Sequence, residues 1–136
     1  YTAPHDAARA VLAEGLIRLG VISQTVDEAL DMESGELKKW YMHNTSHWIG
    51  LDVHDAGVYK PGGSPRLLEP GMCLTVEPGL YFGAWRPDVD CPERYANIGI
   101  RIEDDVLITA EGPVVLTADC PKTIDDIERI VGTDPQ

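Results

Sequence analysis

Residues 43–55 of this chain read HNTSHWIGLDVHD, and VEPG at residues 76–79 and RIEDD at residues 101–105 follow. Three histidines and two glutamates are thus distributed over three short motifs in a fixed order. Imidazole and carboxylate groups in this mixture bind divalent cations such as Mn²⁺, Co²⁺ and Zn²⁺, and two such cations together can serve hydrolysis. The motifs therefore indicate a metal site, although a two-metal centre usually needs more acidic ligands than they provide.

The sequence before Glu77 predicts a turn and then a strand. Residues 70–71 are Pro-Gly, which suits the two central positions of a type II turn. From residue 72 onward, aliphatic side chains alternate with Cys73, Thr75 and Glu77. Glu77 should therefore end this strand on its less aliphatic face.

A second predicted strand carries the other glutamate. Isoleucines at residues 98, 100 and 102 alternate with Gly99, Arg101 and Glu103, so the arginine and the glutamate should share the face opposite the isoleucines. We expect Asp104 and Asp105 to form a solvated turn or bend that leads into a further strand at residues 106–109.

Helical patterns precede and follow these strands. Residues 2–20 carry apolar side chains at helical spacing, and a capping-box pair at Thr25 and Glu28 predicts a short helix through Met32. Residues 40–42 favour an extended segment, and Thr123 should cap a last helix over residues 124–131. This order predicts an α+β fold with a mostly antiparallel sheet.

Composition narrows the function classes. A length of 136 residues suits one domain, and a formal charge of -12 argues against nucleic acid or an anionic membrane as a partner. Cys73, Cys91 and Cys120 are widely spaced and indicate neither a disulfide framework nor a thiolate zinc site, which favours a cytoplasmic protein. The chain begins with Tyr1, so it is interpreted as a piece of a longer protein.

Histidines at positions 43, 47 and 54 are candidates for metal binding and proton transfer. A single histidine is more often a hydrogen-bonded structural residue than a ligand, but three nearby imidazoles can divide ligation and proton transfer among them. For Glu77 and Glu103, a solvated or salt-bridged role is the alternative, and Arg101 could neutralise one of them. Each glutamate follows an aliphatic strand, where we expect burial, and burial would favour a cation because an unpaired buried carboxylate is costly.

Aromatic residues surround these polar positions in the sequence. Trp48, Tyr59, Tyr81 and Trp85 lie close to the three motifs, and an apolar rim beside convergent polar groups is typical of a substrate pocket. Of these, Tyr59 and Tyr81 are the candidates for substrate contact.

The motifs at residues 43–55, 68–81 and 99–105 together resemble the catalytic domain of the Xaa-Pro aminopeptidases, or aminopeptidase P, in the pita-bread metallopeptidase family. The resemblance covers essentially the whole chain. It implies the C-terminal half of a pita-bread fold over residues 1–136, with helices packed on a curved sheet. It also implies two divalent metal ions, most often Mn²⁺ with Co²⁺ or Zn²⁺ as alternatives, and a peptide substrate with proline at its second position.

The resemblance assigns roles to individual residues. Metal ligands are implied at His47, Glu77 and Glu103, and Glu103 would bridge both ions. In the implied mechanism a hydroxide that bridges the ions attacks the substrate. Glu77 accepts the proton of the water from which this hydroxide forms. The other two ligands of the family, both aspartates, lie upstream of Tyr1. The missing upstream half is therefore an expected partner, association between copies is expected as well, and the chain alone should be inactive.

Further catalytic and substrate-binding roles follow from the same resemblance. His43 and His54 match histidines that contact the substrate, and His54 matches the proton shuttle. Arg101 matches an arginine that pairs with a ligand aspartate, and Tyr59 and Tyr81 match active-site tyrosines.

One motif residue departs from the family pattern, and two other functions remain open. Asn44 replaces a usual glycine, and asparagine tolerates a left-handed backbone. An Xaa-Pro dipeptidase, or prolidase, would share the ligands and the mechanism. A metal-free peptide-binding module on the same fold is the alternative from another class.

Overall fold

The structure is a computed structural model that describes residues 1–83, 86 and 89–132. Its α-helices and strands are α1 (Ala3–Arg18), α2 (Val26–Leu30), β1 (Cys73–Val76), β2 (Gly79–Phe82), β3 (Ile98–Arg101), β4 (Asp104–Thr109), β5 (Gly112–Val115) and α3 (Ile124–Ile130). Short 3-10 helices occupy Glu36–Lys39, Pro61–Gly63 and Glu93–Tyr95. Among the described residues, none of the helices combines the length and the apolar composition that a bilayer-spanning helix needs.

The first two helices agree with the sequence pattern. Helix α1 buries Ala13 and Leu16 completely, and its apolar side contributes to the core. The capping box before α2 is formed, because the Thr25 N–H donates to Glu28 Oε2 at 2.8 Å and the Glu28 N–H donates to Thr25 Oγ1 at 3.4 Å. Helix α2 ends at Leu30, slightly before the predicted end.

The prediction of an extended segment from residue 40 is wrong at its first residue. Trp40 closes the preceding 3-10 helix, and its N–H donates to the Leu37 carbonyl at 2.9 Å. Trp40 and Tyr41 then pack into the core beside Phe82 and the helices. Burial of these rings decides the local conformation here, which strand propensity alone does not register.

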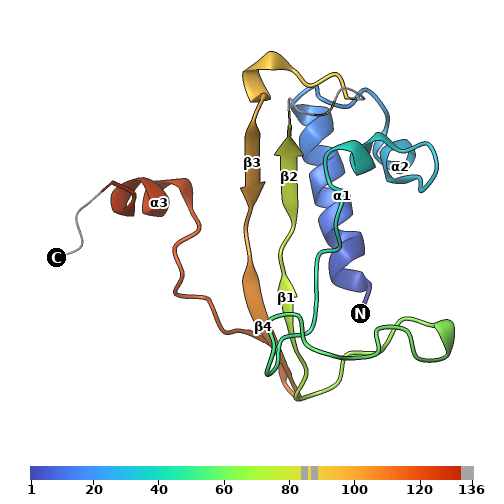
Figure 1. The fold of residues 1–136 in the computed structure, drawn as a ribbon, viewed down its shortest axis with the longest axis vertical. Coiled ribbons are helices and arrows are strands. Elements are labelled where there is room, and N and C mark those ends of the chain that lie inside the picture. The colour runs from blue at the N-terminus through green and yellow to red at the C-terminus, as the bar shows by residue number, and fades with distance from the viewer. Residues whose placement is uncertain (84–85, 87–88, 133–136) are drawn as a thin grey trace.

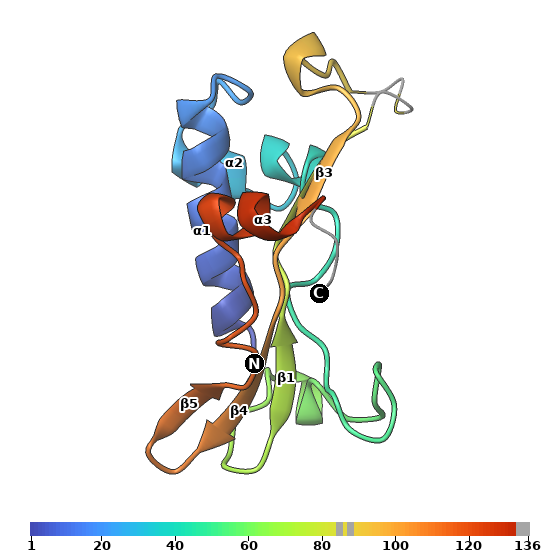
Figure 2. The ribbon, with the colours of Figure 1, turned by 90° about the vertical axis from the view of Figure 1, so that its left-hand side faces the viewer.

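Two antiparallel ladders form one long ribbon. Strand β1 pairs with β4 and β2 pairs with β3, and β5 adds to the other edge of β4. Val76 lies opposite Asp104 and Gly79 lies opposite Arg101, so the same register continues through the short break between the ladders. Figures 1 and 2 show this ribbon running along the molecule, and Figure 1 shows α1 beside β2 with α3 on the other side of the strands. The predicted α+β class with antiparallel strands is confirmed.

The turn before β1 also forms as predicted. Gly71 has a φ of 93°, and the Met72 N–H donates to the Glu69 carbonyl at 3.2 Å. This positive φ at the third position is what a type II turn requires. The turn thereby sets the start of β1 and the alternation that leads to Glu77.

Asp104 and Asp105 do not form a solvated turn. They are the first two residues of β4, and both are partly buried. Asp104 accepts a 2.6 Å hydrogen bond from Thr117 Oγ1 and lies 2.9 Å from Lys122 Nζ, and these two partners lower the pKa of its carboxyl group. The interruption falls at residues 102–103 instead, and the two partners that hold Asp104 come from the segment after β5.

The isoleucine face of β3 is exposed. Ile98, Ile100 and Ile102 are 43%, 58% and 48% exposed, and they border an apolar groove of about 380 Å³ beside α1. Glu77, at the end of β1, is buried with 8% of its surface exposed, whereas Glu103, after β3, is exposed. The expectation that both glutamates are buried is wrong for Glu103 within this chain.

Candidate metal centre

The break in the ribbon brings the two glutamates together. Continuation of the register through the break places Glu77 opposite Glu103 on one face. The segment around His47 pairs with the other edge of β1, because the Thr75 N–H donates to the His47 carbonyl at 3.0 Å and the Glu77 N–H donates to the Thr45 carbonyl at 2.7 Å. One ligand atom from each of His47, Glu77 and Glu103 lies within 4.8 Å of the others.

Glu77 is the buried member of this group. Its Oε1 lies 3.0 Å from His47 Nε2 and accepts a 3.0 Å hydrogen bond from Thr75 Oγ1. Its Oε2 lies 3.6 Å from the guanidinium of Arg101, a side chain that is 48% exposed. Because solvent weakens that ion pair, Arg101 compensates the buried carboxylate only in part.

The protonation of His47 tests whether these residues fit a cation. His47 Nδ1 lies 3.0 Å from the Trp48 carbonyl, which can only accept, so Nδ1 carries a proton. In the neutral ring, Nε2 then presents its lone pair to the Glu77 carboxylate at 3.0 Å. The Nε2 lone pair and the carboxylate oxygen are both acceptors, so a proton or a cation must lie between them. A histidine whose Nδ1 donates to a carbonyl is also the usual arrangement for a metal ligand. The donor set therefore fits a divalent metal ion.

Thr75 is not among the residues that the sequence predicted to act in the site. It is completely buried, accepts the His47 N–H at 3.0 Å and donates to Glu77 Oε1 at 3.0 Å. One hydroxyl thus connects the two segments that carry His47 and Glu77. The alternation of β1 already placed Thr75 on the face of Glu77, and that was the signal that could have identified it.

Replacing Thr75 with valine, which has a similar shape, should weaken metal binding by roughly 10- to 100-fold, because partners that orient metal ligands contribute about that much. Calorimetric titration with Mn²⁺ measures the change in the intact polypeptide, meaning this chain together with the upstream half that the resemblance implies. Thr109→Val is the matched control, since Thr109 also loses a hydroxyl hydrogen bond but lies at the β4–β5 turn. Equal affinities for Thr75→Val and Thr109→Val would show that Thr75 has no role in the site.

A chain of hydrogen bonds holds His43 beside this group. Arg101 Nε donates to the Tyr81 hydroxyl at 2.8 Å, and that hydroxyl lies 2.9 Å from His43 Nε2. His43 Nδ1 donates to the Asn44 carbonyl at 2.7 Å. The Tyr81 hydroxyl contact, supported by the carboxylates of Glu77 and Glu103, raises the pKa of Arg101 against the opposing effect of burial. Gly79 makes this contact possible, because a Cβ there would lie 2.7 Å from the Tyr81 hydroxyl.

His54 and Tyr59 lie on the other side of His47. The rings of His47 and His54 meet edge to face with centroids 4.3 Å apart, and His54 is exposed. Tyr59 stacks on Trp48 at 5.4 Å, and its hydroxyl accepts the Trp48 N–H at 3.3 Å. Trp85, the remaining aromatic candidate, lies outside the described residues.

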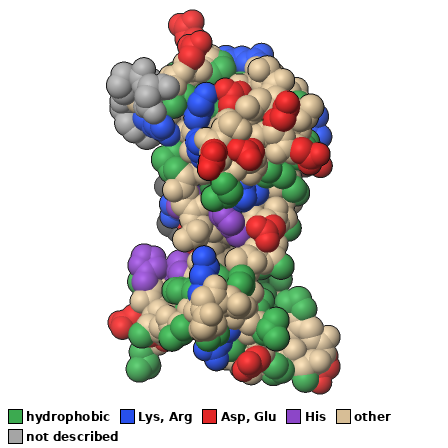
Figure 3. Space-filling view, turned by 90° about the vertical axis from the view of Figure 1, so that its right-hand side faces the viewer, with side chains coloured by type: hydrophobic (Ala, Val, Ile, Leu, Met, Phe, Trp, Pro, Cys, Tyr) green, Lys and Arg blue, Asp and Glu red, His purple; other side chains and the backbone are tan. Residues whose placement is uncertain are grey.

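A cavity of about 620 Å³ joins these groups. Its wall includes His43, His47, His54, Tyr59, Glu77 and Arg101. Figure 3 shows histidine side chains gathered around the narrow middle of the molecule on the face turned to the viewer. Six of the eight candidate residues thus line this cavity, and Tyr81 contacts its wall at His43. The eighth, Glu103, belongs to the group of three candidate ligands.

The wall also contains residues that the sequence did not single out. His5, the fourth histidine, lies with Nδ1 2.8 Å from the hydroxyl of the completely buried Thr45. Burial, and then the nearby Arg9 charge, lowers the pKa of His5. Tyr1 contacts the Tyr59 ring at 4.8 Å, and its burial and the neighbouring Tyr59 and Glu77 raise its pKa to about 12. Both contacts join the first residues of the chain to distant segments, so only the fold reveals them.

Asn44 does not need the left-handed backbone that its replacement of glycine led us to expect. Within the described chain, Asn97 is the non-glycine residue with a positive φ. Residue 44 therefore has a negative φ, which does not require glycine, so asparagine fits the loop without strain.

Comparison with known proteins gives the chain a family. The model of the Peptidase_M24 family, described as metallopeptidase family M24, matches residues 1–110. This chain belongs to metallopeptidase family M24. The Xaa-Pro aminopeptidase of Escherichia coli (strain K12) is 48% identical over 121 residues, which cover 89% of the chain and 26% of that protein. Xaa-Pro aminopeptidase 1 of Streptomyces coelicolor is 45% identical over 126 residues, or 92% of the chain and 25% of that protein.

Solved structures extend this result to the fold of the M24 chain. The aminopeptidase PepP of Pseudomonas aeruginosa superimposes with a TM-score of 0.85 at 45% identity, covering 95% of this chain and 28% of that one. Aminopeptidase P of Escherichia coli with the inhibitor Pro-Leu superimposes with a TM-score of 0.77 at 47% identity, covering 92% of this chain and 27% of that one. The fold is therefore that of aminopeptidase P, the pita-bread fold. The chain spans about a quarter of the length of the relatives that it matches.

Proposed function

We propose that this chain supplies part of the active site of an Xaa-Pro aminopeptidase, which hydrolyses the bond between an N-terminal residue and a following proline. The observation that carries this proposal is the meeting of His47, Glu77 and Glu103 within 4.8 Å in an M24 chain. The names of the relatives support the reaction class, and the metallopeptidase family supports a metal-dependent hydrolase.

The metal centre is proposed to hold two divalent ions, most favourably Mn²⁺, with Co²⁺ or Zn²⁺ as alternatives. A Zn-substituted Escherichia coli aminopeptidase P in complex with product is among the similar structures, with a TM-score of 0.77. His47, Glu77 and Glu103 would be the ligands from this chain. Bound ions would supply a water activated at neutral pH and charge stabilisation for the reacting carbonyl.

Three ligands do not complete a two-metal site. We therefore propose that residues 1–136 form the C-terminal part of the catalytic domain, and that two aspartates come from sequence beyond it. The coverage of about a quarter of each relative supports this division. Association between copies and a cytoplasmic location stay predictions from the sequence.

The proposed protein groups divide the proton transfers. Glu77, which is buried and oriented by Thr75, would accept the proton of the attacking water. A proline nitrogen in a peptide carries no hydrogen, so it must receive a proton in order to leave as an amine. His54 is exposed on the cavity and is the proposed donor of that proton.

The remaining candidates would position the substrate. His43 is held by Tyr81 and faces the cavity, which suits contact with the substrate carbonyl as its negative charge develops. Tyr59 and Tyr81 are the proposed aromatic contacts of the peptide. Arg101 would fix Tyr81 and balance Glu77, to which it lies at 3.6 Å.

An assay of the intact polypeptide tests the proposal. We expect Mn²⁺-dependent release of the first residue from Ala-Pro-Leu and little release from the matched peptide Ala-Ala-Leu. Cleavage of Ala-Pro but not of Ala-Pro-Leu would instead establish the dipeptidase. Peptide binding without metal or cleavage would establish the metal-free binding module.

A further inference from the structure

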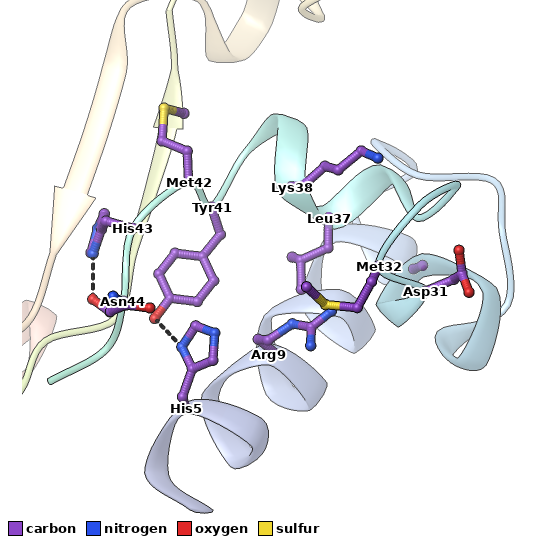
Figure 4. Close-up of a pocket in the computed structure, with 11 residues that line it drawn as sticks. His5, Arg9, Asp31, Met32, Leu37, Lys38, Tyr41, Met42, His43 and Asn44 are labelled. Carbon is purple, nitrogen blue, oxygen red and sulfur yellow. Dashed lines mark hydrogen bonds between the residues drawn. The ribbon is translucent and has the colours of Figure 1, made fainter. Parts of the chain in front are cut away.

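A second cavity adjoins the candidate metal centre. It has a volume of about 320 Å³ and lies between α1, α2 and the segment that leads into residue 43. His5, His43 and Asn44 line both this cavity and the larger one, so the two share a wall. In Figure 4, His5 lies beside Tyr41 at this boundary. The two cavities therefore adjoin each other at His43.

The charge of the second cavity is opposite to that of the chain. The chain has 23 acidic and 11 basic residues, yet Arg9 and Lys38 both line this cavity. Among the described residues, neither side chain forms an ion pair with a carboxylate: Arg9 Nη2 and Lys38 Nζ donate to the backbone carbonyls of Leu30 and Glu33. The remaining guanidinium N–H groups of Arg9 have no hydrogen-bond partner in the described part of the chain.

The acidic residue of this cavity is already engaged. Asp31 Oδ1 accepts the N–H groups of Glu33 and Ser34 at 3.0 and 2.7 Å, and these contacts together with the Ser34 hydroxyl lower the pKa of its carboxyl group. Asp31 keeps its negative charge, and Lys38 also contributes to its lowered pKa. Among the described residues no ion pair joins Asp31 to Arg9, which donates to the Leu30 carbonyl. The positive charge of Arg9 is left for a ligand.

The cavity also has an apolar floor. Leu37 and Tyr41 line it and are 2% and 5% exposed, and Met32 adds a flexible apolar side chain. Figure 4 shows Arg9 extending from α1 toward Leu37 and Met32. An apolar surface with a partly buried guanidinium suits a ligand that carries an apolar side chain close to a carboxylate.

We propose that this cavity is a subsite for the carboxylate-bearing end of the peptide, beyond the proline, with Arg9 as its principal anion-binding residue and Lys38 as a weaker second one. The assignment rests on the proposed peptidase function. Electrostatics chooses the end of the peptide, because a cationic pocket attracts a carboxylate and repels the ammonium group at the other end. Either the C-terminal carboxylate of a short peptide or an acidic side chain offers this chemistry.

Binding of product-like peptides tests the subsite without turnover. Pro-Leu and its C-terminal amide would be titrated calorimetrically into the metal-loaded intact polypeptide. The peptides Pro-Leu-Glu-amide and Pro-Leu-Gln-amide form a second pair that tests an acidic side chain. We expect the carboxylate member of at least one pair to bind about five- to tenfold more tightly than its neutral partner, as a charge-assisted contact at a half-buried site provides.

Arg9→Gln should reduce that ratio to about one, because glutamine keeps a donor for the Leu30 carbonyl and removes the charge. Arg18→Gln is the matched control, since Arg18 is exposed in the last turn of the same helix. Lys38→Met should lower the ratio less. The ratio within a pair does not change when a variant is merely less stable.

Each outcome decides the assignment. A preference for the carboxylate that depends on Arg9 supports the subsite, and the responding pair identifies the source of the carboxylate. Equal binding of acid and neutral peptides, or a preference that Arg9→Gln leaves intact, overturns the subsite while the peptidase proposal stands. Failure of Pro-Leu and its amide to bind at all would overturn both.

Discussion

His54→Ala is expected to lower turnover of an Xaa-Pro peptide by about 10²–10⁴-fold, the usual contribution of a general acid or base, while the metal content stays unchanged. The reason lies in its place: His54 is exposed on the cavity and contacts the His47 ring, but it does not belong to the group of three candidate ligands. Steady-state kinetics and elemental analysis of the same preparation of the intact polypeptide measure both quantities.

His47→Ala is the matched control for this prediction. It removes the same side chain from a proposed ligand position, so activity and metal content should fall together. If His54→Ala lost metal in proportion to its activity, His54 would be a ligand and the proposed proton transfer would be wrong.

Residues 1–136 alone are expected to bind Mn²⁺ weakly or not at all and to leave Xaa-Pro peptides uncleaved. Loss of a partner that only orients a ligand costs roughly 10- to 100-fold in metal affinity, and the lack of two direct carboxylate ligands should cost more. Without the ions, the negative charges of the Glu77 and Glu103 carboxylates also repel each other. Calorimetry with Mn²⁺ and a peptide cleavage assay measure these two properties.

Addition of the preceding half of the domain as a separate polypeptide should restore both properties together. The exposed isoleucines of β3 and the apolar groove beside α1 provide surface for that association. A purified 136-residue chain that held two Mn²⁺ ions and cleaved Ala-Pro-Leu would refute the division of the site between the two halves.

Local patterns predicted the parts of the site that depend on strand alternation. The Pro-Gly turn and the alternation of β1 placed Glu77 on the face of Thr75, and the isoleucine repeat placed Glu103 with Arg101. Antiparallel pairing in one register then makes the two glutamates neighbours. The capping box before α2 was readable for the same reason, because its two side chains are three residues apart and bond to each other's backbone.

Features that depend on distant segments could not be read in this way. The partners of Asp104 are Thr117 and Lys122, so nothing near residue 104 distinguishes a strand from a turn. Trp40 caps the preceding 3-10 helix, and its ring packs into a core that segments far away in the sequence complete. Arg9 lies beside the segment before His43 only after α1 has packed, and its role therefore has no sequence motif.

His47, Glu77 and Glu103 are proposed as ligands of a two-metal centre that residues outside this chain complete. Anomalous diffraction from crystals of the intact polypeptide grown with Mn²⁺ tests this proposal most directly. We expect two manganese peaks, both in contact with Glu103 and one also with His47 and Glu77. Two aspartates from the preceding sequence should be the remaining protein ligands. Manganese bound elsewhere, with Glu77 paired only to His47 and Arg101, would contradict the proposal.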